Sequence, residues 1–344
     1  MKKVLLTMCS LCVGMMMLQS CCKGDEIINP GINPTQLSVW EQNNMTIVNA
    51  NYQTGAFPAP TGSSSINGIT VNSNALQGGM NIVTIITNTA YNRFYIGSKD
   101  DTSGYLVYVP EATTADGAGN YMYTIPIIYS TLYNNNSMTM LISAEDENGE
   151  ITEPYEAKIN FVSSESGELN INLTFSNAKD VDLHLFMPNG EQIYYGARGG
   201  TVQTIGGTTI SYGLDHDSNA GCNIDNLNNE NIYIPAELIQ SGTYRVVVNM
   251  FNNCNPNITT SWSIVTRYKG QLISTTTGKN PATGVYPIGA SNGDMTTVME
   301  FKITDGTGTR AGSNIKADSF VPTPLSDMDI MKMEEAKFYK ELNK

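Results

Sequence analysis

The chain is poor in basic residues, in histidine and in long apolar runs. Each shortage argues against a class of partner or of site. Lys and Arg number 19 against 32 Asp and Glu, which gives a formal net charge of −13. An acidic surface repels phosphate backbones and anionic lipid headgroups, so nucleic acid is not an expected partner. Only His184 and His216 occur, and a zinc site built on them would need two or more further ligands. No glycine-rich phosphate loop stands between a strand and a helix.

The N-terminus has the pattern of an export signal. Lys2 and Lys3 precede a short apolar run, and the small residues Ser20 and Cys21 follow at the expected cleavage site. Leu18 to Cys21 resembles the lipobox of bacterial lipoproteins, in which the cysteine is lipidated and becomes the first mature residue. An ordinary cleaved signal is the alternative. No later stretch is long and apolar enough to span a bilayer. We therefore expect a signal peptide over 1–20 and a lipidated tether over 21–36, with Cys21 as the lipid site and the membrane as a partner through that anchor.

The residues after the cysteine bear on where the protein resides. Cys22 to Glu26 resembles the short Lys/Asp/Glu tag that sends lipoproteins of Bacteroidetes to the cell surface, although Gly24 interrupts the acidic run. A charged, solvated linker is the alternative. The resemblance implies a bacterial, Bacteroidetes-type surface lipoprotein, anchored by lipid in the outer membrane.

Strand-like runs fill the chain from about residue 37 to residue 305. They are short, rich in Val, Ile, Thr and Tyr, and separated by clusters of Gly, Asn, Pro and Ser. Asn148-Gly149 and Asn189-Gly190 are typical of hairpin turns. The polar stretch 163–168 divides the runs, which predicts an all-β fold with two β-sandwich domains in tandem. About seven strands over 37–165 favour an immunoglobulin-like sandwich, and 166–305 forms the second. Residues 306–344 read as a linker and a short terminal helix, with fraying as the alternative.

The second half carries five elements in a fixed order. They are the strand Asp180–His184, the hairpin Pro188–Glu191, the loop Leu214–Asp217, the strand Glu230–Ile232 and the strand Gly242–Val248. Together they resemble the YfaP-like domain of unknown function in bacterial exported proteins, over about 170–304. An insertion before the loop departs from the family pattern. The resemblance implies a β-sandwich with a binding or scaffolding role and supplies no reaction.

Two cysteines lie within the predicted domains, Cys222 and Cys254. An isolated pair in an exported protein predicts one disulfide, and two separate thiols are the alternative.

Acidic and amide side chains alternate beside both histidines. The run Asp215-x-Asp217-x-Asn219 has the oxygen spacing of a calcium loop, although it lacks the remaining features of an EF-hand. The alternative is that these side chains cap turns by bonding their own backbone. Both histidines are expected to be packing residues. The predicted calcium ligands are Asp180, Asp182, Asp215, Asp217, Asn219 and Asp225.

One segment is similar to a hydrolase motif. Gly289 to Gly293 fits G-x-S-x-G around Ser291, but a strand-like run follows where a nucleophile elbow needs a helix. We therefore expect no enzyme and no catalytic residue, and predict a surface module that binds a glycan or protein ligand. The alternatives are a structural subunit of an outer-membrane or pilus-type assembly and a cryptic hydrolase. An exposed aromatic platform, with Tyr194, Tyr195 and Tyr212 as candidates, would favour a glycan. A terminal donor segment would favour assembly.

Overall fold

The computed structural model of the chain describes residues 37–306, except 112 and 205, together with 321–322. The predicted signal peptide, the tether with Cys21 and the terminal helix lie outside the described residues, so these three expectations stay predictions. Within the part of the chain that is described, no helix has the length and apolar character needed to cross a bilayer.

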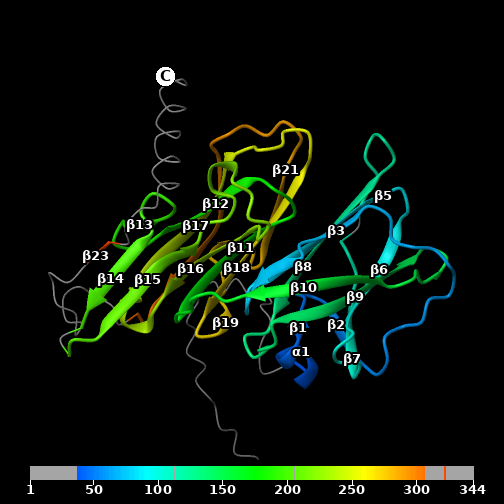
Figure 1. Ribbon diagram of the computed structural model, residues 1–344, viewed down its shortest axis with the longest axis horizontal. Coiled ribbons are helices and arrows are strands. Elements are labelled where there is room, and N and C mark those ends of the chain that lie inside the picture. The colour runs from blue at the N-terminus through cyan, green and yellow to red at the C-terminus, as the bar shows by residue number, and fades with distance from the viewer. Residues whose placement is uncertain (1–36, 112, 205, 307–320, 323–344) are drawn as a thin grey trace, which may run out of the picture.

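The first half of the described chain forms two sheets (Figure 1). One has four strands in the order β1-β8-β5-β3, and the other has six in the order β2-β7-β6-β9-β10-β4. Neighbouring strands are antiparallel except β10 and β4, which are parallel. The elements are α1 (Val39–Asn43), β1 (Met45–Thr46), β2 (Asn51–Thr54), β3 (Ile69–Val71), β4 (Asn74–Leu76), β5 (Met80–Thr87), β6 (Tyr91–Ser98), β7 (Gly104–Tyr108), β8 (Tyr121–Tyr129), β9 (Ser137–Asp146) and β10 (Tyr155–Val162).

The second half forms two further sheets. The larger has eight strands in the order β19-β18-β11-β16-β15-β14-β23 with β21 beside β18, and the smaller runs β13-β12-β17-β22-β20. The elements are β11 (Leu169–Phe175), β12 (Asp180–Phe186), β13 (Gln192–Ile193), β14 (Gly199–Gln203), β15 (Thr209–His216), η2 (Ala220–Cys222), β16 (Asn229–Ile234), η3 (Ala236–Leu238), β17 (Gly242–Asn252), β18 (Thr260–Tyr268), β19 (Gln271–Leu272), β20 (Thr277–Gly278), β21 (Ala282–Tyr286), β22 (Asp294–Ile303) and β23 (Val321–Pro322).

Each half has its own hydrophobic core between its two sheets, which is why the apolar residues alternate along the strands. Phe94, Ile125 and Met140 are fully buried in the first core. In the second core, β12 and β17 are neighbours in one sheet and turn their apolar sides to the same face. The apolar side chains that these two strands place in the core on this side are Tyr244, Val246, Val248, Met250, Val181, Leu183 and Leu185. The prediction of an all-β chain with several antiparallel sheets is therefore confirmed.

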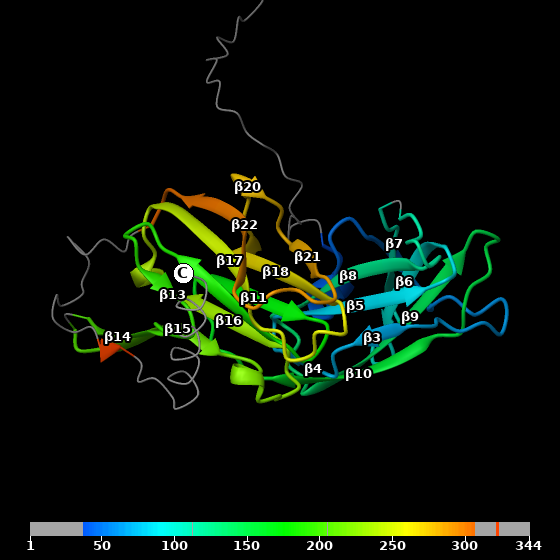
Figure 2. The same ribbon diagram turned by 90° about the horizontal axis from the view of Figure 1, so that it is seen from above.

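The two halves lie side by side along the longest axis, and β5 of the first half lies against β11 and β18 of the second (Figure 2). Met80, Ile128 and Val265 form a small apolar cluster at this junction. Polar contacts flank the cluster. The Asn72 amide donates to the carbonyl of Phe175 at 2.8 Å, so the junction is a specific contact as well as an apolar one.

Two local features test the sequence patterns. The Asn-Gly turns are confirmed, since Gly149 and Gly190 have positive φ angles of 80° and 86°, as hairpin turns require. Helix α1 was not predicted. Its capping box has Ser38 Oγ accepting from the Glu41 amide at 3.1 Å, and Glu41 Oε2 accepting from the Ser38 amide at 2.9 Å. This reciprocal pair stabilises a helix of five residues.

Candidate metal centre

Strand β12 has apolar side chains on one side and polar side chains on the other. Its apolar residues face the second core, and Asp180, Asp182 and His184 face the opposite side. A strand at the surface would expose such polar groups. Here Asp180 and Asp182 are fully buried and His184 is nearly so. Another part of the chain must therefore cover this side of the strand.

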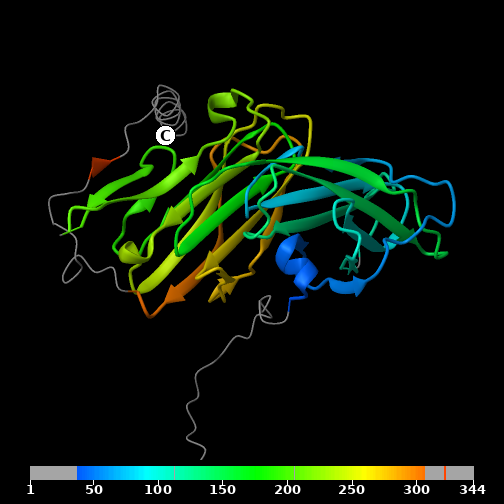
Figure 3. The ribbon, with the colours of Figure 1, turned by 60° about the horizontal axis from the view of Figure 1, so that its bottom comes forward.

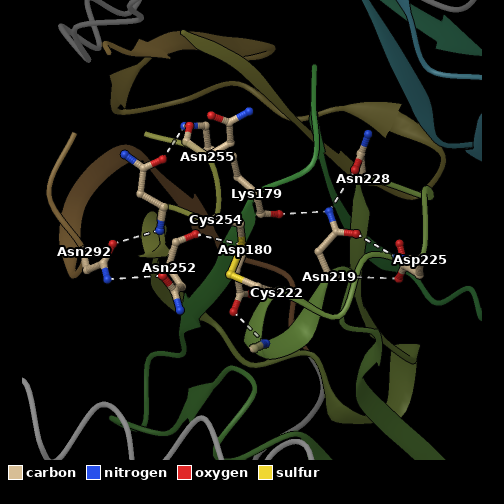
Figure 4. Close-up of a disulfide and its surroundings, with 12 residues drawn as sticks. Lys179, Asp180, Asn219, Cys222, Asp225, Asn228, Asn252, Cys254, Asn255 and Asn292 are labelled. Carbon is tan, nitrogen blue, oxygen red and sulfur yellow. Dashed lines mark hydrogen bonds between the residues drawn. A yellow bond between two sulfur atoms is a disulfide. The ribbon is translucent and has the colours of Figure 1, made fainter. Parts of the chain in front are cut away.

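The cover is the loop that follows β15. Within it, Gly221 donates its backbone N–H to Asp180 Oδ2 at 2.8 Å (Figure 4). The loop is held down by a disulfide between Cys222 in η2 and Cys254, which follows β17. The predicted disulfide is thus confirmed in the structure. It joins residues separated by 32 positions, with Cα atoms 5.6 Å apart, and it fixes the loop over the end of β12.

Three carboxylates meet beneath this loop. Asp217 comes down from the loop, and one oxygen from each of Asp180, Asp182 and Asp217 lies within 4.8 Å of the others. Calcium takes oxygen ligands at 2.3–2.6 Å, so two ligands of one ion are at most about 5 Å apart. The triad therefore fits a calcium ion in both donor type and spacing. It offers neither nitrogen nor sulfur, the ligands that a structural zinc site uses.

A further oxygen lies on the neighbouring strand. Asn249 of β17 stands directly opposite Asp182 in the antiparallel pair, so the two side chains share a face. Asn249 is only 6% exposed, and its Oδ1 accepts no hydrogen bond from any described residue. A buried amide oxygen without a donor is uncommon. It adds a candidate ligand that the sequence motif did not include.

A buried lysine precedes the first acid of the triad in the sequence. Lys179 immediately precedes Asp180 and is fully buried. Its ammonium donates to the carbonyl of Asn255 at 2.5 Å and to the side chain of Asn253. Burial lowers the pKa of Lys179 because desolvation disfavours the charged form. Among the described residues Lys179 forms no ion pair with a carboxylate, so its charge is not taken up by a direct bridge to the triad.

Asp215 has a different role from the one predicted. Its carboxylate accepts from the Glu165 amide at 2.6 Å and from the Asn231 side chain at 2.7 Å. The register of β15 against β16 shifts between Leu214 and His216, which makes Asp215 the extra residue of a bulge. A bulge breaks the simple alternation that would place Asp215 and Asp217 on one side. Burial raises the pKa of Asp215, the largest effect on it, while its hydrogen bonds and nearby His216 act in the opposite direction.

Asp225 and Asn219 also lie outside the triad and close the loop on itself. Asp225 accepts from the Ser218 hydroxyl and the Leu227 amide, both at 2.8 Å. Asn219 Oδ1 accepts from the Asp225 amide at 3.0 Å, while its Nδ2 donates to the carbonyl of Lys179 at 2.9 Å. These contacts are the turn chemistry that was the alternative to metal binding. The predicted set thus divides into an acidic triad and a turn-forming group.

Packing and hydrogen bonds hold both histidines. His184 Nδ1 lies 2.7 Å from Gln192 Nε2, and its ring stacks on Tyr194 with centroids 5.1 Å apart. His216 Nε2 lies 2.9 Å from the carbonyl of Ser163. Neither belongs to the acidic triad.

The candidate aromatic platform is not on the surface. Tyr195 and Tyr212 are buried in the second core, and the Tyr212 hydroxyl donates to Glu191 at 2.7 Å. Tyr194 is half-buried against His184. The sequence could not show that these tyrosines are buried, because the direction of a tyrosine side chain depends on strand pairing.

Comparison with known proteins adds little to this picture. No family model matches the chain, and no curated protein matches it. Among solved structures, the chain has a weak likeness to the D00-D0 domain of Intimin, with 13% identity over 63% of this chain and 98% of that one. The TM-score is 0.12, too low to establish a shared fold. The comparisons and the structure together establish a β-rich chain with a buried acidic triad that is able to hold an ion.

Proposed function

We propose that this chain is a lipid-anchored protein of the outer membrane that acts as a non-catalytic binding or scaffolding module, with calcium stabilising its second sandwich. The observation that carries the proposal is the meeting of Asp180, Asp182 and Asp217 within 4.8 Å, two of them fully buried. Carboxylates at this range repel one another, and a divalent cation removes that repulsion. The ion has a structural role and takes part in no reaction.

The position of the loop explains what the ion would stabilise. Asn219 stands two residues beyond Asp217 and donates to Asn228 at 2.8 Å. Asn228 donates in turn to Asn72 of the first half at 3.1 Å. A cation bound by Asp217 would therefore order a loop that contacts both sandwiches. With this loop ordered, the two sandwiches would form a rigid body suited to presenting a binding surface for a glycan or a protein.

The finer fold assignment is part of the proposal. We assign an immunoglobulin-like sandwich to the first half and a YfaP-like sandwich to the second. Tyr244 supports a sandwich of this general kind, since its hydroxyl donates to the carbonyl of Gln240 at 2.9 Å, four residues upstream. Such a tyrosine near the start of a strand, bonded back to the chain, is a feature of immunoglobulin-type sandwiches.

The segment around Ser291, which is similar to a hydrolase motif, bears on the non-catalytic assignment. Ser291 lies in an irregular loop between β21 and β22 and is exposed. A nucleophile elbow needs a sharp turn from a strand into a helix. The local structure at Ser291 supports a connecting loop.

Calcium titration by calorimetry tests the metal site directly. The full chain should bind one calcium ion, and Asp182→Asn should abolish the heat of binding because it removes a buried ligand. Asp225→Asn is the matched control, since Asp225 bonds only within the loop. The proposal fails if the wild-type chain shows no binding heat, or if Asp182→Asn binds as the wild type does.

A separate experiment tests the anchor. Cys21→Ala should move the protein from the detergent phase to the aqueous phase, because lipid would no longer be attached. Unchanged partition would show that Cys21 carries no anchor.

A second candidate function is assembly through strand addition. Val321 and Pro322, which form β23, pair with Thr201 and Gly200 at the edge of β14. An edge that accepts one segment offers the same backbone groups to another. A chain ending at residue 306 should therefore bind a peptide of residues 316–328, while the full chain should not. Equal binding by both chains, or binding by neither, argues against assembly at this edge.

A further inference from the structure

A cavity of about 280 Å³ lies between the two sandwiches. Its wall combines residues 128–132 and four residues between 37 and 46 of the first half with three residues of the second. The four are Leu37, Glu41, Gln42 and Thr46, and the three are Arg267, Gly270 and Leu272. The volume is just below the range of roughly 300–1,000 Å³ typical of small-molecule sites. The size limits an occupant to a small molecule.

The charged group in the wall from the second sandwich is Arg267 of β18. It is 8% exposed, and its guanidinium donates to the carbonyls of Gly78 at 2.5 Å and Tyr129 at 3.2 Å. A guanidinium has five N–H groups. The other three have no acceptor among the described residues, and no described carboxylate lies within 4.0 Å of Arg267. Burial lowers the pKa of Arg267 to about 10, so it stays charged at neutral pH.

A buried cation without a counter-ion is costly. The chain has 32 acidic residues, yet no described one pairs with Arg267. Gly78 and Tyr129 supply carbonyl dipoles but no net negative charge. The remaining N–H groups of a guanidinium match a carboxylate in shape, because both are planar and form parallel hydrogen bonds. An anion in the cavity would both compensate the charge and satisfy the donors.

The rest of the wall limits the kind of anion. Glu41 also lines the cavity, and its carboxylate is already bonded to Ser38 and to the Thr46 hydroxyl, the latter at 3.1 Å. Its negative charge disfavours a doubly charged ligand such as inorganic phosphate. Ile128, Leu132 and Leu272 supply an apolar surface. The wall therefore suits a ligand with one negative charge and an apolar body.

We propose that this cavity is a binding site for a small organic monocarboxylate. The carboxylate accepts hydrogen bonds from the remaining N–H groups of Arg267, and the apolar tail lies against Ile128, Leu132 and Leu272. Because the wall is drawn from both sandwiches, the bound carboxylate also holds them together.

The test follows the Arg267 Nε–H resonance of the full chain by NMR, assigned by its loss in Arg267→Lys. Butyrate should shift this resonance to saturation. Butyramide has the same shape without the charge and should not, and inorganic phosphate should also leave the resonance in place. The proposal is overturned if butyrate gives no saturable shift, or if butyramide gives the same shift as butyrate.

Two variants at exposed positions keep the test independent of folding. Leu132 lines the cavity but is 66% exposed, so Leu132→Asp adds a negative charge at the rim with little risk to the core. It should weaken butyrate at least tenfold. Val285→Asp is the matched control, because Val285 is 45% exposed on β21 and does not line the cavity. Equal affinity in the two variants would overturn the proposal even if Arg267 variants fail to fold.

Discussion

Replacing Asp217 with Asn should stabilise the second sandwich in chelator and remove most of its stabilisation by calcium. The three carboxylate oxygens lie within 4.8 Å of one another. At that distance each pair of charges repels by about 3 kcal/mol at an effective dielectric constant of about 20. Asp217 takes part in two such pairs, which together repel by about 6 kcal/mol. Interactions that the carboxylate loses in the substitution offset part of this gain, so we expect its neutralisation to raise the free energy of unfolding by at least about 1 kcal/mol when no ion is present.

Calcium should act in the opposite way on the wild type. At a free concentration of about 100 times Kd, a bound ion contributes about 2.7 kcal/mol to the free energy of unfolding. For a domain of this size that is a rise of roughly 5–10 °C in Tm. Asp217→Asn lacks one carboxylate ligand, and we expect it to retain well under half of this rise.

The two tryptophans provide the assay. Trp40 is buried in the first core and Trp262 in the second, so Trp40→Phe leaves a fluorescence signal for the second sandwich alone. Melts of this background with calcium and with chelator compare wild type, Asp217→Asn and Asp225→Asn. The Asp225 variant loses turn contacts and should be destabilised equally in both buffers. The reasoning is refuted if Asp217→Asn is less stable than wild type in chelator, or if its calcium increment is undiminished.

Three further predictions concern the surroundings of the triad. Replacing both Cys222 and Cys254 with Ala should lower the free energy of unfolding by about 3.7 kcal/mol, as the chain-entropy model gives for a closed loop of this length. Urea denaturation of the double variant measures this loss, and a loss under about 1 kcal/mol contradicts that model here. Burial raises the pKa of Asp215. As pH rises above about 3.8, the carboxyl therefore ionises in the unfolded chain before it ionises in the folded protein. Its contribution to stability falls from that pH up through the raised pKa of the folded state. The stability of wild type relative to Asp215→Asn should accordingly be greater at pH 4 than at pH 7, and the opposite slope in urea midpoints would show that burial does not dominate. Gly213→Ala should cost at least about 2 kcal/mol, because φ is +131° and a Cβ would meet a backbone oxygen at 1.8 Å; Gly117→Ala, in open space, is its control in the same thermal melts.

The fold prediction rested on runs of strand-forming residues and on turn residues, and it could not give the pairing of the strands. The β character and the hairpin turns at Gly149 and Gly190 are set by neighbours in sequence, so short patterns predicted them. The order of strands within the four sheets depends on contacts between distant segments, which no local pattern encodes. Helix α1 was missed although Ser38 and Glu41 have the spacing of a capping box, because five residues are too few for a visible helical period.

The sequence predicted only part of the candidate site, because some of its residues come together only through contacts between distant segments. Asp180 and Asp182 share a side of one strand, and alternation alone placed them together. Asp217 joins them only because a loop folds back, while the bulge at Asp215 sends the preceding acid elsewhere. Asn249 was visible in the sequence on the polar side of its strand, but its position opposite Asp182 follows from the register between β12 and β17. A motif search finds ligands that are close in sequence and misses the one contributed across the sheet.

The place where the described chain begins has a consequence for the proposed lipid anchor. Leu37 lines the cavity shared with Arg267, so it lies at the junction and not at a far end of either sandwich. Figure 3 shows α1, which begins two residues later, on the underside near the middle of the molecule. If the proposed anchor at Cys21 holds, the pull of the tether acts at this midpoint. The attachment would then be near the middle of the body, with the two sandwiches extending from it in opposite directions (Figure 3).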